Sequence, residues 1–237
     1  MNKSNNILKR LELLHPKKID LSLDRLRKLL EKLDNPHLKL PPVIHVAGTN
    51  GKGSVISYLR SIYEKNGLKV HTYTSPHLIR FNERIRINSK LVDNRYLSSL
   101  LEECEDKNNG QSITFFEITT AAAFLAFSRI SSDLLLLETG LGGKYDATNI
   151  IKTSVCSILT PISMDHMNFL GTDLLKIANE KIVILKKKSM IVLSKQKKPV
   201  RQFIRNEVKK KQANLYEEGI NWKIAKELKN SFVLNFC

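Results

Sequence analysis

The hydrophobic positions of this chain follow two different periods. Leucines at 23, 26, 30 and 33 have helical spacing and predict an amphipathic helix that ends at Asn35-Pro36. Short apolar runs predict buried strands at residues 43–47, 69–73, 134–137, 154–160 and 190–193. Further helices are predicted over residues 54–65, 96–105, 117–128, 174–185 and 200–211. The polar stretch 105–111 predicts a loop.

Buried strands that alternate with helices indicate the α/β class, with a doubly wound, mainly parallel sheet flanked by helices. Ligands of such sheets bind at the carboxyl ends of the strands. Segments rich in polar side chains leave the ends of four predicted strands, at residues 48–54, 73–77, 138–149 and 165–166. We therefore expect these four segments to converge on one edge of the sheet.

The turn after the first predicted strand, in VIHVAGTNGKGS (43–54), is suited to hold a phosphate. Its three glycines let the backbone approach an anion, Lys52 supplies a counter-charge, and Ser54 offers a hydroxyl to a phosphate or to Mg²⁺. The spacing departs from the P-loop pattern G-x-x-x-x-G-K-[ST], because Val46 replaces the first glycine and Gly53 separates Lys52 from Ser54. A strand-to-helix turn without a ligand remains the alternative.

Glu138 ends a run of four leucines, so its carboxylate stands where a buried strand meets the predicted cleft. A charge there is costly unless it is paired or binds a metal. Asp146, Thr148 and Asn149 follow it and offer oxygen ligands or hydrogen bonds to a substrate. A turn with a capping side chain would explain the same residues.

Three more residues would not be singled out by their local sequence, and they become candidates through their position near the ends of the predicted strands. Ser75 precedes Pro76, which restricts the backbone and can aim the hydroxyl at Mg²⁺. His166 is a candidate metal ligand or general base, with a structural histidine as the alternative. Lys181, in a helical stretch of mixed character, has the pattern of a solvated lysine.

The chain has a formal charge of +16 and a pI of about 9.8, and its lysines and arginines concentrate between residues 186 and 211. Such a surface can attract nucleic acid. Phe203 is the lone aromatic among these cations, so the stacking platform of single-strand binders is missing. A solvated, lysine-rich surface is the simpler interpretation, and nucleic acid is not the expected partner.

The rest of the composition bounds the compartment. No apolar run approaches the roughly 20 residues of a membrane span, and the polar start of the chain does not have the pattern of a signal peptide. The three widely spaced cysteines, at 104, 156 and 237, suit neither a disulfide framework nor a zinc site. We expect a cytoplasmic, monomeric protein.

Seven segments together resemble the folylpolyglutamate synthase and dihydrofolate synthase group of the Mur ligase superfamily. They are IDLSLDRL (19–26), HVAGTNGKGSV (45–55), YTSPHLIRFNERIRIN (73–88), TFFEITTAAAF (114–124), LETGLGGKYDATN (137–149), MDH (164–166) and LGTDLLKIANEKIVILK (170–186). GTNGK alone would indicate only the wider Mur ligases, whereas the TSPH and GLGGKYDATN segments point to the folate branch. The resemblance implies a Mur-ligase-type, P-loop ATP-binding domain over residues 1–237.

The resemblance also implies an ATP-dependent, ADP-forming ligase that adds L-glutamate to dihydropteroate or reduced folates through an acyl phosphate. ATP phosphates would be held by Thr49, Asn50, Gly51, Lys52, Gly53 and Ser54. Mg²⁺, as one or two ions, would be held by Ser75, Glu138 and His166. Catalytic roles would fall to Lys52, His166 and Lys181, the last carbamylated by CO₂. The pterin-containing substrate would contact Phe115, Phe116, Glu117, Tyr145, Asp146 and Ala147.

The chain departs from the family in two places. The family usually reads EKAGI where this chain has EKIVI (180–184), and we expect the bulkier side chains to shift the helix that presents Lys181. The family also continues with an L-x-G-x-H-Q segment and a C-terminal glutamate-ligase domain, so the ATPase domain is expected to be incomplete at its C-terminus. A truncated gene, half of a split gene whose other half is encoded separately, and a fragment all fit.

Three other functions compete with this one. A nucleotide-binding remnant or subunit would bind ATP without ligating anything alone. A basic nucleic-acid-binding module would use the cations between residues 186 and 211. A Mur ligase acting on a peptidoglycan precursor would keep the superfamily and change the substrate, although the folate-type segments argue against it.

Overall fold

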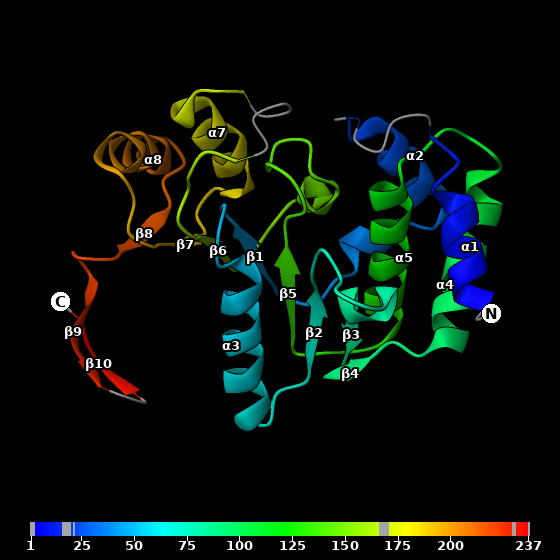
Figure 1. Cartoon of the computed structure of the whole chain (residues 1–237), viewed down its shortest axis with the longest axis horizontal. Coiled ribbons are helices and arrows are strands. Elements are labelled where there is room, and N and C mark those ends of the chain that lie inside the picture. The colour runs from blue at the N-terminus through cyan, green and yellow to red at the C-terminus, as the bar shows by residue number, and fades with distance from the viewer. Residues whose placement is uncertain (1–2, 16–19, 21, 166–170, 229–230, 237) are drawn as a thin grey trace.

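The computed structural model of the chain describes residues 3–15, 20, 22–165, 171–228 and 231–236. An eight-stranded sheet forms its centre (Figure 1). Its strands are β1 (Val43–Ala47), β2 (Val70–Tyr73), β3 (Ile85–Ile87), β4 (Lys90–Leu91), β5 (Leu134–Glu138), β6 (Cys156–Leu159), β7 (Met190–Leu193) and β8 (Asn214–Glu217). Their order in space is β4-β3-β2-β5-β1-β6-β7-β8. The β2–β3 and β3–β4 pairs are antiparallel, and the other pairs of this sheet are parallel. The predicted, mainly parallel sheet is confirmed.

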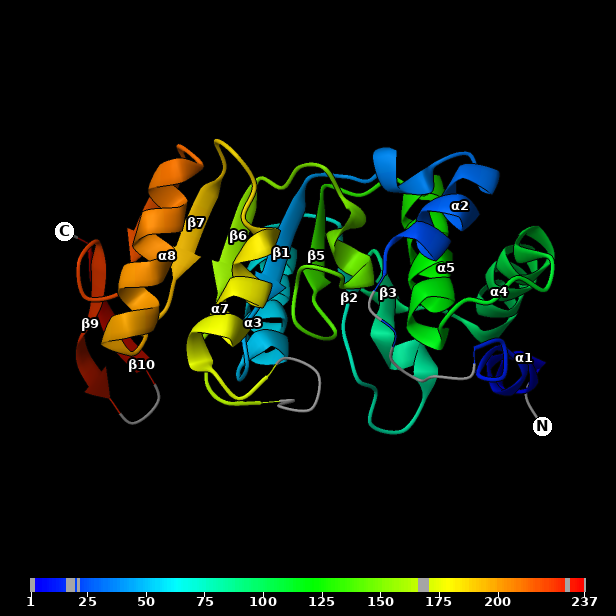
Figure 2. The ribbon, with the colours of Figure 1, turned by 90° about the horizontal axis from the view of Figure 1, so that it is seen from above.

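Helices pack on both faces of the sheet. They are α1 (Lys3–Leu11), α2 (Asp24–Lys32), α3 (Lys52–Lys65), α4 (Asn94–Asn108), α5 (Phe115–Arg129), α7 (Leu174–Lys181) and α8 (Lys198–Lys210). Both views place α1, α2, α4 and α5 towards one end of the sheet and α7 and α8 towards the other (Figures 1 and 2). The amino terminus lies at the first end and the carboxyl terminus at the second.

The central strands are buried on both faces because successive side chains point to opposite sides. Every residue of β1 is buried. Val46 packs with Ile56 of α3 on one face, whereas Val43 joins the cluster of α2, α4 and α5 on the other. Ala47 belongs to a third cluster with Ile177 of α7. The continuous apolar runs of the sequence therefore mark central strands of a doubly wound sheet.

Helix α5 is buried along nearly its whole length, because its own apolar side chains, mainly alanine and phenylalanine, lie on all of its sides. Its start is fixed by a capping box, in which Thr114 Oγ1 accepts from Glu117 N and Glu117 Oε2 accepts from Thr114 N at 2.8 Å. The Tyr73 hydroxyl at the end of β2 lies 3.0 Å from Thr120 Oγ1. These contacts hold the start of α5 beside the carboxyl end of β2.

The structure differs from the predicted elements in several places. The predicted loop 105–111 is wrong in part, because α4 continues to Asn108 with Cys104 buried, and it ends where Asn109 adopts a positive φ. The helix predicted over 174–185 is α at first and then a 3₁₀ turn, η4 (Ile182–Ile184). The sequence pattern did not predict α1, β3, β4 or β8, nor the hairpin of β9 (Trp222–Leu228) and β10 (Ser231–Phe236).

The basic segment between residues 186 and 211 has structural contacts of its own. One face of α8 is buried, and both Arg201 and Arg205 donate to the carboxylate of Glu217 at the end of β8. Lys186 donates to Asn149 Oδ1 at 2.8 Å. These three cations therefore pair within the fold. Within the described ranges, no helix has the length and apolar character to cross a membrane.

Candidate functional site

Strands β2, β5, β1 and β6 are neighbours in the sheet, so the segments that leave their carboxyl ends meet at one edge. Ser75 N, after β2, donates to Glu138 Oε2 at 3.2 Å. Thr49, after β1, exchanges hydrogen bonds with Ser163, after β6: Thr49 Oγ1 donates to Ser163 O and accepts from Ser163 N, both at 3.1 Å. These hydrogen bonds join the four segments in two pairs, and His166 lies outside the described residues.

The glycine-rich turn brings its backbone close to the sheet. A Cβ on Gly48 would lie 1.9 Å from Thr160 Oγ1, so only glycine fits there. Gly51 precedes α3 with a φ of 83°, in the left-handed region that favours glycine. Lys52 Nζ folds back and donates to Gly48 O at 3.2 Å and to Thr49 O at 3.4 Å.

The amino end of α3 lies close to Glu138, the acidic residue that ends β5. No side chain among the described residues caps this helix, so its first N–H groups are available to an anion. A Cβ on Gly53 would lie 3.8 Å from Glu138 Oε2. A groove lined by Gly51, Gly53, Ser54, Ser75 and Glu138, among others, runs along this side.

Glu138 is 4% exposed, and burial raises the pKa of its carboxyl to about 7, although the Ser75 N–H and the Lys52 charge oppose the shift. A buried carboxylate gains from a positive partner. Ser75 and Ser54 place hydroxyl-bearing residues around it, and oxygen donors are what Mg²⁺ prefers. Glu138 and Ser75 therefore fit a divalent cation. Among the described residues, no group of three or more His, Cys, Asp or Glu side chains is placed to hold a metal ion.

Lys181 ends α7 and is only 3% exposed. Its Nζ donates to Gly48 O at 2.9 Å, the same carbonyl that Lys52 contacts. Burial lowers its pKa to about 8, and the nearby charge of Lys52 adds to this effect. Although η4 has the bulkier sequence Ile-Val-Ile, Lys181 still contacts the glycine-rich turn through the Gly48 carbonyl.

Gly143 allows the loop after β5 to lie directly against α7. A Cβ at this position would lie 2.6 Å from Glu180 O and 3.1 Å from Lys181 Cα. The second glycine-rich segment of the sequence therefore serves close packing between backbones. Its contact with α7 places Lys181 beside the loop that carries Asp146.

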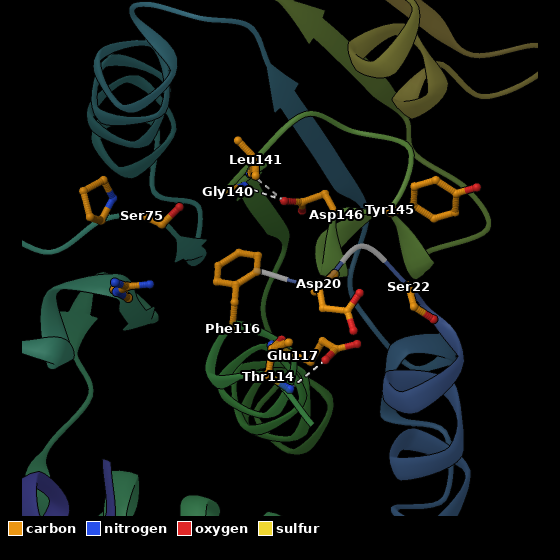
Figure 3. Close-up of a pocket in the computed structure, with 13 residues that line it drawn as sticks. Asp20, Ser22, Ser75, Thr114, Phe116, Glu117, Gly140, Leu141, Tyr145 and Asp146 are labelled. Atoms are coloured by element: carbon orange, nitrogen blue, oxygen red, sulfur yellow. Dashed lines mark hydrogen bonds between the residues drawn. The ribbon is translucent and has the colours of Figure 1, made fainter. Parts of the chain in front are cut away.

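A cavity of about 330 Å³ opens beside this edge, shown in Figure 3. Among the residues that the resemblance assigned to the substrate, Phe116, Glu117, Tyr145, Asp146 and Ala147 line it. Phe115 does not, because its ring packs edge-on against Phe81 with centroids 5.9 Å apart. The resemblance assigned no role to Asp20, Ser22 and Arg84, which also line the cavity, although all three stand in its matching segments.

Asp146 organises the loop rather than facing the cavity with a free carboxylate. Its Oδ2 accepts from Gly140 N and Leu141 N, both at 2.8 Å, and its Oδ1 accepts from the N–H and the hydroxyl of Thr148. Burial raises the pKa of this carboxyl, against the effect of those hydrogen bonds. Phe116 lies over Gly140, where a Cβ would be 2.6 Å from its ring.

The model of the Mur ligase middle domain matches residues 46–234, which is most of the chain and includes the glycine-rich turn, Ser75, Glu138 and Lys181. The chain belongs to the Mur ligase family. Its resemblance to the folate branch is confirmed by sequence. This Mur ligase family member is 38% identical over 221 residues to a dihydrofolate synthase/folylpolyglutamate synthase of Haemophilus influenzae, covering 93% of the chain and 49% of that relative.

Solved structures agree with the sequence match. E. coli FolC in complex with DHPP and ADP is 33% identical with a TM-score of 0.88, over 98% of this Mur ligase chain and 55% of that one. A bifunctional folylpolyglutamate synthase/dihydrofolate synthase with Mn, AMPPNP and L-glutamate bound is 32% identical with a TM-score of 0.82, over 97% and 56%. The chain spans about half the length of the curated relatives it matches.

Proposed function

We propose that this chain is the ATP-binding part of an ADP-forming ligase that adds L-glutamate to dihydropteroate or reduced folates. One observation carries the proposal. Ser75 and Pro76 line both the groove at the amino end of α3 and the cavity that holds Phe116 and Glu117. A substrate carboxylate that reaches out of the cavity would therefore meet a phosphate held at α3. Relatives solved with ADP, AMPPNP, Mn, DHPP and L-glutamate support this assignment of ligands.

The reaction would proceed in two steps. A carboxylate oxygen of the pteroate or folate attacks the γ-phosphorus of ATP, ADP leaves, and an acyl phosphate forms. The amine of L-glutamate then attacks the acyl carbon, phosphate leaves, and an amide is produced. This chemistry depends on positioning and on charge stabilisation more than on covalent catalysis.

The turn residues 49–54 would hold the phosphates through their N–H groups, with Lys52 as the counter-charge. Ser75 and Glu138, with His166, would hold Mg²⁺. Such an ion neutralises charge on the transferring phosphoryl group when it is bound. The cavity would fix the substrate so that its carboxylate points towards Ser75, and it would exclude water from the acyl phosphate.

We also propose that Lys181 is carbamylated. The lowered pKa of about 8 favours the neutral amine, which is the form that attacks CO₂. In that reaction the Nζ–C bond forms, a proton leaves, and the cation becomes an anionic carbamate able to help bind a second Mg²⁺. Incubation with ¹³C-bicarbonate should give a carbamate ¹³C resonance that Lys181→Arg removes. No resonance at high bicarbonate and pH 8.5 would contradict the modification.

The setting of the chain is part of the same proposal. Residues 1–237 would form one ATP-binding unit, monomeric and cytoplasmic. The half of the ligase that this chain does not match would supply adenine contacts and much of the glutamate site, from the same polypeptide or from a separate one. If that half is needed for turnover, this chain alone would bind nucleotide without ligation.

The experiment is an assay of ADP release from the purified chain with ATP, Mg²⁺, dihydropteroate and L-glutamate. Release that needs both co-substrates and is lost in Lys52→Ala supports the ligase. Lys65→Ala, on the exposed end of the same helix, is the matched control. Saturable ATP binding without turnover supports a nucleotide-binding subunit. No ATP binding, with tight RNA binding at physiological salt, would contradict the proposal.

A further inference from the structure

Two carboxylates that line the cavity, Asp20 and Glu117, are joined by Arg25, which stands behind them and does not line it. Arg25 Nε donates to Glu117 Oε2 at 3.1 Å, Nη1 to Asp20 Oδ2 at 3.1 Å, and Nη2 to the Asp20 carbonyl at 2.9 Å. Arg25 stands on α2 and Glu117 on α5, so the guanidinium joins two helices. Asp20 and Arg25, both in the motif 19–26, therefore link α2 to α5, and the proposed reaction gives Arg25 no role.

Glu117, which lines the cavity, has one carboxylate oxygen that is unpaired among the described residues. The residue is 4% exposed, and its Oε2 is held by Arg25 and by Thr114 N. Its Oε1 is buried and has no hydrogen-bond partner within the described part of the chain. A buried oxygen without a partner is costly. The cost indicates that a donor arrives from outside, and the cavity that Glu117 lines is where it can arrive.

The other groups of the cavity suit a flat, polar ring. Figure 3 shows Phe116 and Tyr145 on different sides of the space, with Asp20, Glu117 and Ser22 at its lower end. Asp146 has both carboxylate oxygens engaged by the backbone and by Thr148. Glu117, by contrast, keeps a buried carboxylate oxygen that has no hydrogen-bond partner among the described residues.

We propose that Arg25 is a positioning residue for the substrate. It fixes the Glu117 carboxylate so that Oε1 accepts N–H groups from the amino-substituted heterocycle of the ligand. This inference rests on the proposed function, since the 2-amino-4-oxo ring of a pteroate presents such N–H donors. The planar fork of arginine suits the task because it holds Glu117 and Asp20 at once, which the point charge of lysine cannot do.

Calorimetric binding of two ligands to the purified chain tests the proposal. One ligand is pteroate, and the other is its analogue with the 2-amino group replaced by methyl. The wild type should prefer pteroate by roughly tenfold or more, because a hydrogen bond to a carboxylate is lost in the analogue. Arg25→Met should weaken pteroate and leave the analogue nearly unchanged, so that the preference disappears. Arg25→Lys should lose most of it.

Arg27→Met is the matched control, because Arg27 lies on the same helix, is exposed and pairs with Asp24, three residues before it. It should keep the wild-type preference. A purely structural role of Arg25 would weaken both ligands equally, and that result would overturn the proposal. If Arg25→Met does not fold, an unchanged preference in Arg25→Lys overturns it.

The two proposals fail in different ways. If the wild type binds neither pteroate nor its analogue while it still binds ATP, the pterin assignment is wrong and the role of Arg25 falls with it. If the wild type binds pteroate and the arginine variants keep its preference for the amino group, only the role of Arg25 is wrong.

Discussion

Replacing Lys181 with methionine should stabilise the folded chain at neutral pH. Folding buries this amine, which is 3% exposed, and lowers its pKa from 10.5 to about 8. That difference corresponds to about 3 kcal/mol against the folded, charged form at pH 7. The variant also loses the hydrogen bond to the Gly48 carbonyl, worth about 1 kcal/mol. The expected net gain is therefore about 2 kcal/mol.

The pH dependence follows from the direction of the shift. The unfolded chain binds this proton up to a higher pH than the folded chain, so the stability of the wild type should rise between pH 8 and 10.5, the two pKa values of the group. Below pH 8 the amine is charged in both states, so the wild type lacks the stability that it gains at higher pH. Lys181→Met removes the group, so its advantage over the wild type should shrink through the same window and become, above it, a deficit of about 1 kcal/mol from the lost hydrogen bond.

Guanidinium denaturation at pH 7, 8, 9 and 10 in CO₂-free buffer measures both quantities without interference from a carbamate. Lys176→Met, on the exposed side of the same helix, is the control and should change neither the midpoint nor its pH dependence. The burial cost assigned to Lys181 would be wrong if Lys181→Met were less stable than the wild type at pH 7, or if the stability of both proteins changed equally with pH.

Three further substitutions probe the site and its support. Lys52→Ala should lower ATP affinity tenfold or more in calorimetry while Lys65→Ala does not, because a charge-assisted contact to phosphate is lost; equal affinities would contradict the phosphate role. Gly143→Ala should destabilise the chain by about 1–3 kcal/mol, since its Cβ would lie 2.6 Å from Glu180 O; an unchanged melting temperature would refute this. Tyr73→Phe should cost about 1 kcal/mol in urea denaturation through the lost hydroxyl contact with α5, and no loss would mean that the bond contributes nothing.

The central sheet was predictable because its strands are buried on both faces. Runs such as 134–137 admit few other placements, and the alternation with helices predicts parallel pairing. The elements that the pattern did not predict are stabilised from elsewhere. Helix α1 packs on α4 across some ninety residues of sequence, as the Arg10 to Glu105 pair shows. Strands β3 and β4, at the edge of the sheet, have only three and two residues, too few to show a period. Their stability comes from tertiary contacts that local periodicity does not encode.

The residues of the site also divide into those that could be predicted from sequence and those that could not. Lys52, Ser75 and Glu138 could be proposed from sequence because each follows a strand whose end lies at the same edge. The network of Arg25 and Glu117 could not, because the two residues are 92 positions apart and each has an ordinary helical role in its own segment. A motif match marked both segments, but only the three-dimensional structure shows that one guanidinium joins them.

The glycine-rich turn, Ser75 and Glu138 are proposed to form one site for ATP and its divalent cation. A crystal structure of the chain with AMPPNP and Mn²⁺, with anomalous scattering recorded to locate the metal, tests it most directly. We expect a manganese peak coordinated by Glu138 and Ser75, with the nucleotide phosphates on the N–H groups of residues 49–54. Phosphates bound elsewhere, or a metal peak away from both side chains, would contradict it.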